Sequence, residues 1–215
     1  MRPSLPLRFA RALFRDTRGM SIIEFALALP LLVMGVFGGL EIANLVVTHM
    51  RLNQIAISLA DNASRLKQQT VSGAPKIREY DVNESFKAAQ QQGADLDLVK
   101  NGRLILSSLE TNASDGQWIH WQRCQGTKTA YASDYGTEGT GQTGTSFEGM
   151  GPTGNKVTAE PDSAVMVAEV VYEYQPLIAD KLFDKFTIRK YSAMYVRDDR
   201  DLAAGVAATG VKSSC

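Results

Sequence analysis

Residues 19–24, Gly-Met-Ser-Ile-Ile-Glu, lead directly into FALALPLLVMGVFGGL at residues 25–40, and this stretch decides the fold. Those 16 residues include no charged or strongly hydrogen-bonding side chain. From Ile22 to Val47, the only strongly polar residues are Glu24, Glu41 and Asn44. About 20 apolar residues in a helix cross a hydrocarbon core roughly 30 Å thick. The stretch is therefore predicted to be a membrane-spanning helix.

The composition is that of a folded protein. The chain has 215 residues, of which 44% are apolar and 21% charged, which argues against wholesale disorder and against a polytopic membrane protein. Its 23 basic and 23 acidic residues cancel, which argues against a nucleic-acid binder that acts through a global positive field. The balance is uneven, because residues 2–18 contain five arginines and one acid, Asp16. This basic segment predicts a cytoplasmic amino terminus, with the rest of the chain facing outward.

Three interpretations of the amino terminus are open on these grounds. A cleaved secretory signal has a basic start, but this apolar run is long, opens with an acid and precedes no A-x-A-like site. An uncleaved signal anchor is the second. The third starts from Glu24, because a carboxylate costs about 2.5–3.5 kcal/mol at the centre of a membrane helix, less near an end, and is usually functional. A cut after Gly19 would give Met20 a free amine, which Glu24 could neutralise from one helical turn away or from a neighbouring subunit.

The order of basic leader, glycine, four residues, glutamate and apolar helix resembles the leader of type IV prepilins and pseudopilins. The local sequence resembles the Tad-type minor pilins and pseudopilins, the TadE/TadG-like family. The residues that carry this resemblance are Arg18–Leu27, Leu29-Pro30-Leu31, Glu41–Asn44 and the Tyr-x-Tyr-x-Pro-Leu segment at 172–177. The resemblance covers about residues 16–66 and 163–200. It implies cleavage between Gly19 and Met20 by a prepilin peptidase in the inner membrane, followed by incorporation into, or priming of, a Tad pilus.

The pattern beyond the span predicts an α+β fold. Apolar residues at intervals of three and four predict one helix from about Met20 to Gln68, whose second half packs on a soluble domain. Asp81–Glu84 resembles a capping box and predicts a short helix that ends before Gly93. Strands are expected at 103–109, 117–123, 163–174 and 186–196. We expect a long helix laid over an antiparallel sheet of about four strands, as in pilin heads, with no prediction of strand order.

The predicted organisation has four parts. Residues 1–19 form a cleaved cytoplasmic leader, 20–47 the transmembrane part of the helix, 48–70 its amphipathic continuation, and 71–215 an extracytoplasmic α+β domain. Residues 134–155 contain seven of the 18 glycines and no apolar periodicity, so they are expected to form a long exposed loop. Trp118 and Trp121 have opposite parity in their strand, which predicts one in the core and one on the surface.

The two cysteines, Cys124 and Cys215, are both predicted to lie outside the cytoplasm, where disulfides persist. A bridge between them would close a loop of about 90 residues, worth about 4–5 kcal/mol in the chain-entropy model, and would tie the tail at 203–214 to the sheet. Two free thiols or a link between subunits are the alternatives. The resemblance favours the bridge, since pilin heads often use a carboxy-terminal disulfide loop.

Residue patterns for catalysis are missing from the sequence. His49 and His120 belong to no H-E-x-x-H motif, no G-x-S-x-G accompanies them, and the literal G-x-G-x-x-G at 139–144 has neither the strand before it nor the helix after it. We therefore predict no enzyme activity, no catalytic residue, no cofactor and no metal site.

The expected function is that of a structural minor pilin or pseudopilin of a Tad (type IVc-like) pilus, needed for pilus assembly or surface attachment. Expected partners are prepilin peptidase, other Tad pilins, inner-membrane pilus assembly proteins and the lipid bilayer, with no nucleic acid. The expected location is the bacterial inner membrane, with the amino terminus cytoplasmic and the carboxy-terminal domain periplasmic, and then the pilus. The alternative is a membrane-anchored extracytoplasmic binding or adhesion module outside any pilus, which uses the Gly/Thr loop or the tryptophan face.

Overall fold

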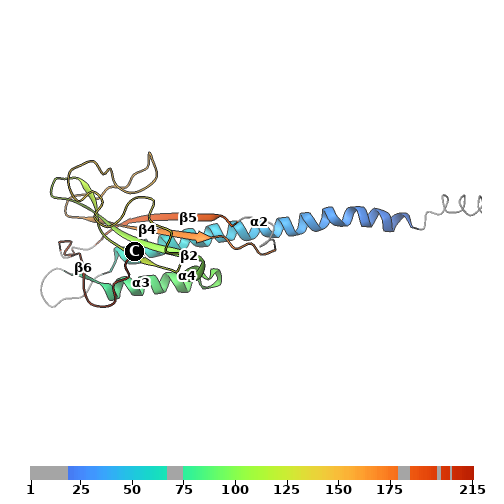
Figure 1. Cartoon of the computed structure of the whole chain (residues 1–215), viewed down its shortest axis with the longest axis horizontal. Helices are drawn as coiled ribbons and strands as arrows, with labels where there is room; N and C mark the ends of the chain where they lie inside the picture. The colour runs from blue at the N-terminus through green and yellow to red at the C-terminus, as the bar shows by residue number, and fades with distance from the viewer. Residues whose placement is uncertain (1–18, 67–74, 179–184, 198–199, 204) are drawn as a thin grey trace, which may run out of the picture. The chain divides into compact units, whose positions relative to one another are not determined.

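A computed structural model describes residues 19–66, 75–178, 185–197, 200–203 and 205–215 (Figure 1). The chain divides into two compact units, one up to Asn44 and one from Leu45 to Cys215. Helix α2, Met20–Ser64, belongs to both. The fold is the α+β arrangement predicted above: a long amino-terminal apolar helix packs on a four-stranded antiparallel sheet.

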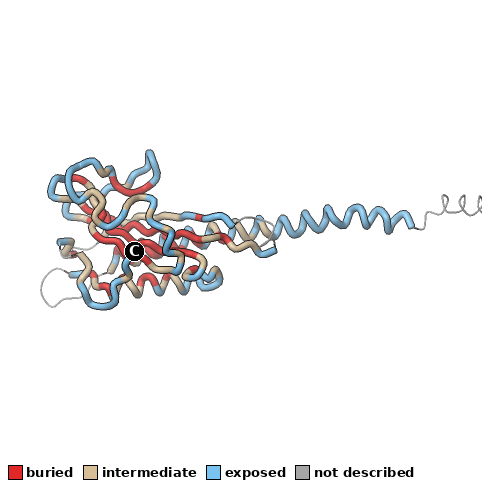
Figure 2. The backbone as a smooth tube through the Cα atoms, viewed as in Figure 1, coloured by how far each residue is buried: buried red, intermediate tan, exposed pale blue. Residues whose placement is uncertain are grey.

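In the first unit, the described residues form only the first part of α2. Every residue from Met20 to Leu40 is exposed, and Figure 2 shows this part of the tube in the colour of exposed residues. The helix passes through Pro30 without ending. Because this part is apolar on all sides, it needs an apolar environment that the described chain does not supply.

In the second unit, α2 is amphipathic, as its periodicity predicts. Its buried residues are Thr48, Leu52, Ile55, Ala56, Leu59, Ala60, Ala63 and Ser64. The helix ends at Ser64, earlier than the predicted Gln68, which lies outside the described residues. Arg200 donates to the carbonyl oxygens of Ala63 and Ser64, at 2.8 Å for Ser64, and so satisfies helix-end acceptors.

The sheet has the order β3-β2-β4-β5, and each neighbouring pair is antiparallel. The strand bounds are close to those predicted: β2 is Gly102–Thr111, β3 Gln117–Gln125, β4 Ala164–Glu173 and β5 Thr187–Tyr195. One face packs against α2, with Leu104, Leu106, Met166, Ala168 and Val170 in a single core cluster with the buried helix residues. This cluster is the main core of the unit.

Helix α3, Glu79–Gln92, contributes Val82, Phe86 and Ala89 to the same core. Its predicted start was wrong: the cap is Arg78, and Asp81 is the third helical residue. The Asp81 carboxylate accepts from the Arg78 backbone N–H at 3.1 Å and from its guanidinium at 2.7 Å, so it acts from inside the first turn. The helix stops before Gly93 as predicted.

Short elements complete the unit. They are the 3-10 turn η1 (Ala94–Leu96), helix α4 (Leu98–Asn101), and the parallel pair β1 (Ile77–Arg78) and β6 (Val206–Ala207).

A buried ion cluster joins α3, β3 and the following loop. Arg123 donates to the Glu79 carboxylate at 2.6 Å, and its other terminal nitrogen lies 2.9 Å from Glu138. The side chains of Arg123 and Glu79 are only 5% and 4% exposed. Desolvation of such a pair costs free energy when the protein folds. Removal of one partner destabilises the fold strongly, because it leaves an uncompensated buried charge. The cluster therefore fixes how α3 and the loop sit on β3.

The loop prediction was partly wrong, because the Gly/Thr-rich segment packs on the second face of the sheet. Met150 is fully buried, and Phe147 and Val157 pack with it against sheet residues such as Leu109 and Val167. Asn112 in the β2–β3 turn donates to the carbonyl oxygens of Gly141 and Gly144 at 2.7 and 2.8 Å. This face is covered by isolated anchoring residues that are separated by glycines. Their spacing is not periodic, so the sequence pattern did not predict that they pack on the sheet.

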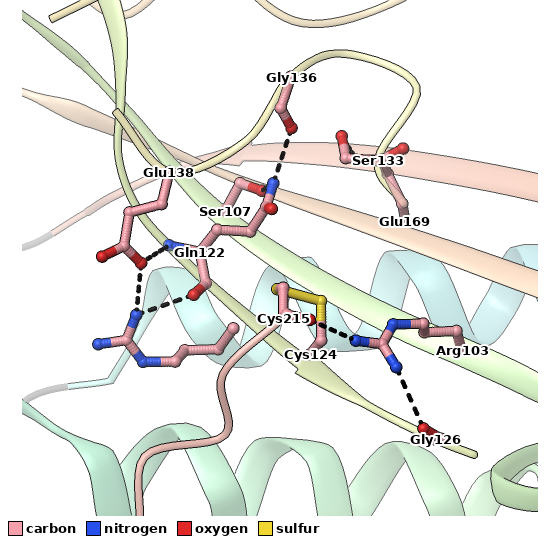
Figure 3. The surroundings of a disulfide bond; sticks show 11 residues. Arg103, Ser107, Gln122, Cys124, Gly126, Ser133, Gly136, Glu138, Glu169 and Cys215 are labelled. Carbon is pink, nitrogen blue, oxygen red and sulfur yellow. Dashed lines mark hydrogen bonds and ion pairs between the residues drawn. A yellow bond between two sulfur atoms is a disulfide. The ribbon is translucent and has the colours of Figure 1, made fainter. Parts of the chain in front are cut away.

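A disulfide fastens the carboxy-terminal segment to β3. Cys124 and Cys215 are bridged with their Cα atoms 4.8 Å apart, which confirms the predicted pairing (Figure 3). The Cys124 N–H donates to the Ser213 carbonyl oxygen at 2.9 Å, and Arg103 donates to the Cys215 carbonyl oxygen at 3.2 Å. Asn83 on α3 holds Val211 in the same way, at 2.8 Å. The tail is thus bound to a strand and a helix that lie far from it in sequence.

A buried carboxylate also holds the covering loop. Glu169 in β4 is 4% exposed and lies beside Ser133, whose hydroxyl donates to it (Figure 3). It also accepts from the Asp134 backbone N–H at 3.1 Å. Burial raises the pKa of Glu169, as does the Asp134 charge, while the two hydrogen bonds and Arg189 oppose the shift. Glu169 is therefore easier to protonate in the folded protein than in the unfolded chain.

We expect Cys215→Ser to lower the free energy of unfolding by about 2–5 kcal/mol, because the unfolded chain loses a cross-link over 91 residues. Urea unfolding of the full chain in detergent, followed by tryptophan fluorescence, measures this. Cys124→Ser should match it, and the double variant should lose no more. Ser214→Ala, at an exposed neighbouring position, is the control and should change stability by less than about 0.5 kcal/mol. Equal stability of Cys215→Ser and the reduced and oxidised wild type would contradict the bridge.

We expect Glu169→Gln to change how stability depends on pH. Since the folded pKa of Glu169 is raised, the wild type loses stability as the pH rises from the ordinary value of 4.5 through that raised pKa. The amide oxygen can accept from the Asp134 N–H while the amide nitrogen donates to the Ser133 hydroxyl oxygen, and the group does not titrate. The variant therefore gains stability relative to the wild type over this pH window. The same unfolding assay at several pH values measures the difference between the two proteins. A difference that stays constant with pH would show that the burial of Glu169 does not disfavour its charge.

Candidate functional site

The predicted cleavage site lies at the start of α2. Gly19 precedes the helix and Met20 is its first residue. The Gly19 carbonyl oxygen accepts from the Ile23 backbone N–H at 3.2 Å, so the helix begins with the peptide unit that joins Gly19 to Met20. Both residues are exposed, and a side chain on Gly19 would meet no atom within 4 Å. The junction is therefore sterically open on the described chain, as a protease substrate requires.

Glu24 is an exposed residue on the same helix. It follows Met20 by four residues, which places it on the same face about 6 Å along the axis. Among the described residues, no side chain hydrogen-bonds or ion-pairs with Glu24 in the way that Ser133 and Asp134 hold Glu169. A free amine on Met20 would lie within one turn of this carboxylate, and an amine on a neighbouring helix could also reach it.

The surface around Glu24 is apolar and open. In the described part of the chain, α2 is the one helix long and apolar enough to cross a membrane, by length and composition. The exposed large side chains include Ile22, Phe25, Leu27, Leu31 and Phe37. Gly35, Gly38 and Gly39 each face open space, so a second helix could approach closely there. The helix is consistent with membrane anchoring.

A second polar cluster lies on the head, where β3 has a bulge. Ser108 pairs with Trp121 and Leu109 with Ile119, so the register skips His120. Trp118 and Trp121 therefore lie on the same side of the sheet, so the expected difference in parity was wrong, because an extra residue shifts the register. Only Trp121 is in the core, as expected for one of the two, and Trp118 is half-buried. Trp121 is buried, and the ring of Trp118 stacks on His120 at 4.3 Å.

The carboxylate of this cluster is paired within the chain, whereas the Trp118 indole nitrogen is buried without a hydrogen-bond partner in the described chain. Glu110 is 5% exposed and accepts from Ser108 at 2.6 Å, with His120 at 2.8 Å from its other oxygen. An open pocket of about 260 Å³ lies beside it. Within the described ranges, no group of three or more His, Cys, Asp or Glu side chains is placed to hold a metal ion. These contacts order the bulged strand. No sequence pattern predicted them, because they join residues of β2 and β3 across the bulge.

The predicted site residues thus form two separate groups. Gly19, Met20 and Glu24 lie within the first turns of α2, while Cys124 and Cys215 join the tail to the sheet. Sequence reasoning missed Arg123, Glu79 and Glu138. No local spacing relates them, since the first two are 44 residues apart in the chain.

Comparison with known proteins bears on the first group. The family described as TadE-like protein matches residues 19–60, which include the junction, Glu24 and most of α2. The resembling segment at 163–200 lies outside this match. No curated protein sequence and no solved structure matches the chain. The protein carries a TadE-like family domain at residues 19–60, and this domain forms its amino-terminal, pilin-like region.

Proposed function

We propose that this protein is a structural minor pilin or pseudopilin of a Tad-type pilus. The observation that carries the proposal is the helix of the TadE-like domain: it is exposed and apolar on every side, and its one early acid lies a single turn after an open Gly19–Met20 junction. A helix of this kind needs lipid in one state and can pack with other such helices in another. Its role is in assembly rather than catalysis.

In this proposal a prepilin peptidase removes residues 1–19. Residues 20–47 then anchor the protein in the bacterial inner membrane, the helix continues to Ser64, and residues 71–215 form the periplasmic domain. The basic leader supports this orientation, because its five arginines favour the cytoplasmic side. The disulfide supports an oxidising compartment for the head.

The proposed role of Glu24 is charge neutralisation during assembly. Cleavage creates an amine at Met20 in a region where an unpaired charge is costly. Glu24 from the same or a neighbouring helix would pair with that amine and so fix the axial stagger between subunits. Other Tad pilins and the inner-membrane pilus assembly proteins are the proposed partners.

The alternative, an adhesion module outside any pilus, gains no support from the Gly/Thr-rich loop. That loop covers the second face of the sheet and contributes Met150 to a buried cluster. Its packing accounts for it as part of the fold.

The cleavage proposal predicts that the mature protein begins at Met20. Amino-terminal sequencing of the protein purified from its native membrane measures this directly. Gly19→Leu should leave the precursor intact, because a branched side chain at that position would obstruct a peptidase that accepts glycine. Gly35→Leu, a matched change farther along the same exposed helix, should be processed normally. An intact Met1, or a mature start near residue 45, would contradict the proposal.

The neutralisation proposal predicts that Glu24→Ala inserts in the membrane and is cleaved but assembles poorly. Removal of the carboxylate leaves the Met20 amine without a partner, which costs on the order of several kcal/mol in apolar surroundings. Membrane fractionation and quantification of surface pili measure the two properties. Glu41→Ala, the other acid of the apolar stretch, is the comparison and should reduce pilus number less. Unchanged pilus output from Glu24→Ala would remove the neutralisation role.

A further inference from the structure

The turn between β4 and β5 exposes apolar side chains. Leu177 is 66% exposed, Ile178 47% and Phe186 44%. These three residues, called the tip patch below, flank residues 179–184, which lie outside the described part of the chain and carry none of the argument. Phe186 is held in place, since its ring lies 5.1 Å from that of Tyr174 and its carbonyl oxygen accepts from the Tyr174 N–H at 3.0 Å. The patch is therefore attached to the ordered end of the sheet.

Strand β5 runs beside α2 in the same direction. Near its start, burial and then the Lys190 charge lower the pKa of His49 on the helix. Near its end, the Arg197 guanidinium lies 3.8 Å from the Asp61 carboxylate. From Lys190 to Arg197, two residues past the end of β5, seven extended residues span about 23 Å, and twelve helix residues span about 18 Å. The charge effect and the ion pair are therefore consistent with side-by-side elements.

This alignment places the tip patch at the end of the unit where α2 enters it. Phe186 precedes Lys190 by four strand residues, about 13 Å, whereas Leu45 precedes His49 by four helix residues, about 6 Å. The patch therefore lies at or past the level of Leu45. Leu45 follows Asn44 directly in the chain, and so the patch lies at the end of the unit that is joined to the apolar span.

The helix exposes further apolar residues at this end of the unit. Val46 is 52% exposed, Val47 46% and Met50 59%. The charge of the sequence around the patch is mixed, because Glu173, Asp180 and Asp184 accompany Lys181 and Lys185. Exposed apolar and aromatic side chains at the end of a domain next to its anchor are typical of surfaces that sit in the headgroup region of a membrane.

We propose that the tip patch is a second membrane contact, in which Leu177, Ile178 and Phe186 enter the headgroup region of the leaflet that faces the head domain. The proposal rests on the proposed anchoring of α2 in the membrane. The two contacts together would limit the rotation of the head about its anchor.

The test uses the full chain in vesicles of phosphatidylcholine and phosphatidylglycerol, with some acyl chains brominated near the headgroup. Flotation of the vesicles first establishes anchoring by α2. Phe186→Trp then places a fluorophore in the patch, and its emission above the wild-type background should shift to the blue and be quenched by the brominated lipid. Leu177→Trp should behave in the same way, which guards against a folding defect of one variant.

Val211→Trp is the matched control. Val211 is 80% exposed and is held to Asn83 of α3, in the tail rather than at the β4–β5 turn. It should show neither the shift nor the quenching. A protein that floats but whose Phe186→Trp emission is not quenched overturns the tip contact and leaves the anchor standing. A blue shift without quenching that grows with the protein-to-lipid ratio assigns the patch to a second copy of the chain and also overturns it. A protein that does not float removes the proposed anchor and the tip contact together.

Discussion

The rest of the structure depends on one constraint: a single helix has to satisfy two different environments. Up to Leu40, α2 exposes apolar side chains on every side, while from Leu52 onward it buries one face against a sheet. The hydrophobic effect favours the second arrangement without any partner, whereas the first is stable only in lipid or among other apolar helices. The head is therefore a self-sufficient core, and the amino-terminal part is not.

The head meets its own constraint with a sheet covered on both faces. The second half of α2 and helix α3 cover one face, and the Gly/Thr-rich segment covers the other. A covering made of loop cannot satisfy its backbone groups internally as a helix does. Side chains of the sheet and of its β2–β3 turn supply part of these bonds, since Asn112 donates to two loop carbonyl oxygens and Glu169 accepts from the Asp134 N–H. Backbone bonds such as those between Ile119 and residues 139 and 140 supply others. Positive φ angles at Gly141 and Gly149 permit the turns between these anchors.

The sequence predicted what depends on periodicity and missed what depends on pairing across the chain. The apolar run of α2, its amphipathic continuation and the four strands follow from side-chain spacing, and all appear within a few residues of their expected bounds. The start of α3 was displaced, because an acid can cap a helix from its third residue as well as from the cap position. The prediction from the parity of Trp118 and Trp121 failed because the bulge at His120 cannot be recognised in the strand pattern.

The same division applies to the candidate site. Gly19, Met20 and Glu24 could be proposed as a site because their spacing is local in the sequence, and the family match at residues 19–60 includes all three. The ion cluster of Glu79, Arg123 and Glu138 could not be predicted, since only the completed fold brings these charges together. The candidate cleavage pattern is therefore local, whereas the head depends on contacts between residues far apart in the chain.

Two carboxylates show how the parts of the chain differ. Glu169 is buried, and the chain supplies its hydrogen-bond donors, so its desolvation is offset within the fold. Glu24 has no comparable partner among the described residues, although it sits in the most apolar segment of the chain. The proposed partner of Glu24 is an amine at Met20, which would exist only after cleavage and could belong to the same or to a neighbouring subunit.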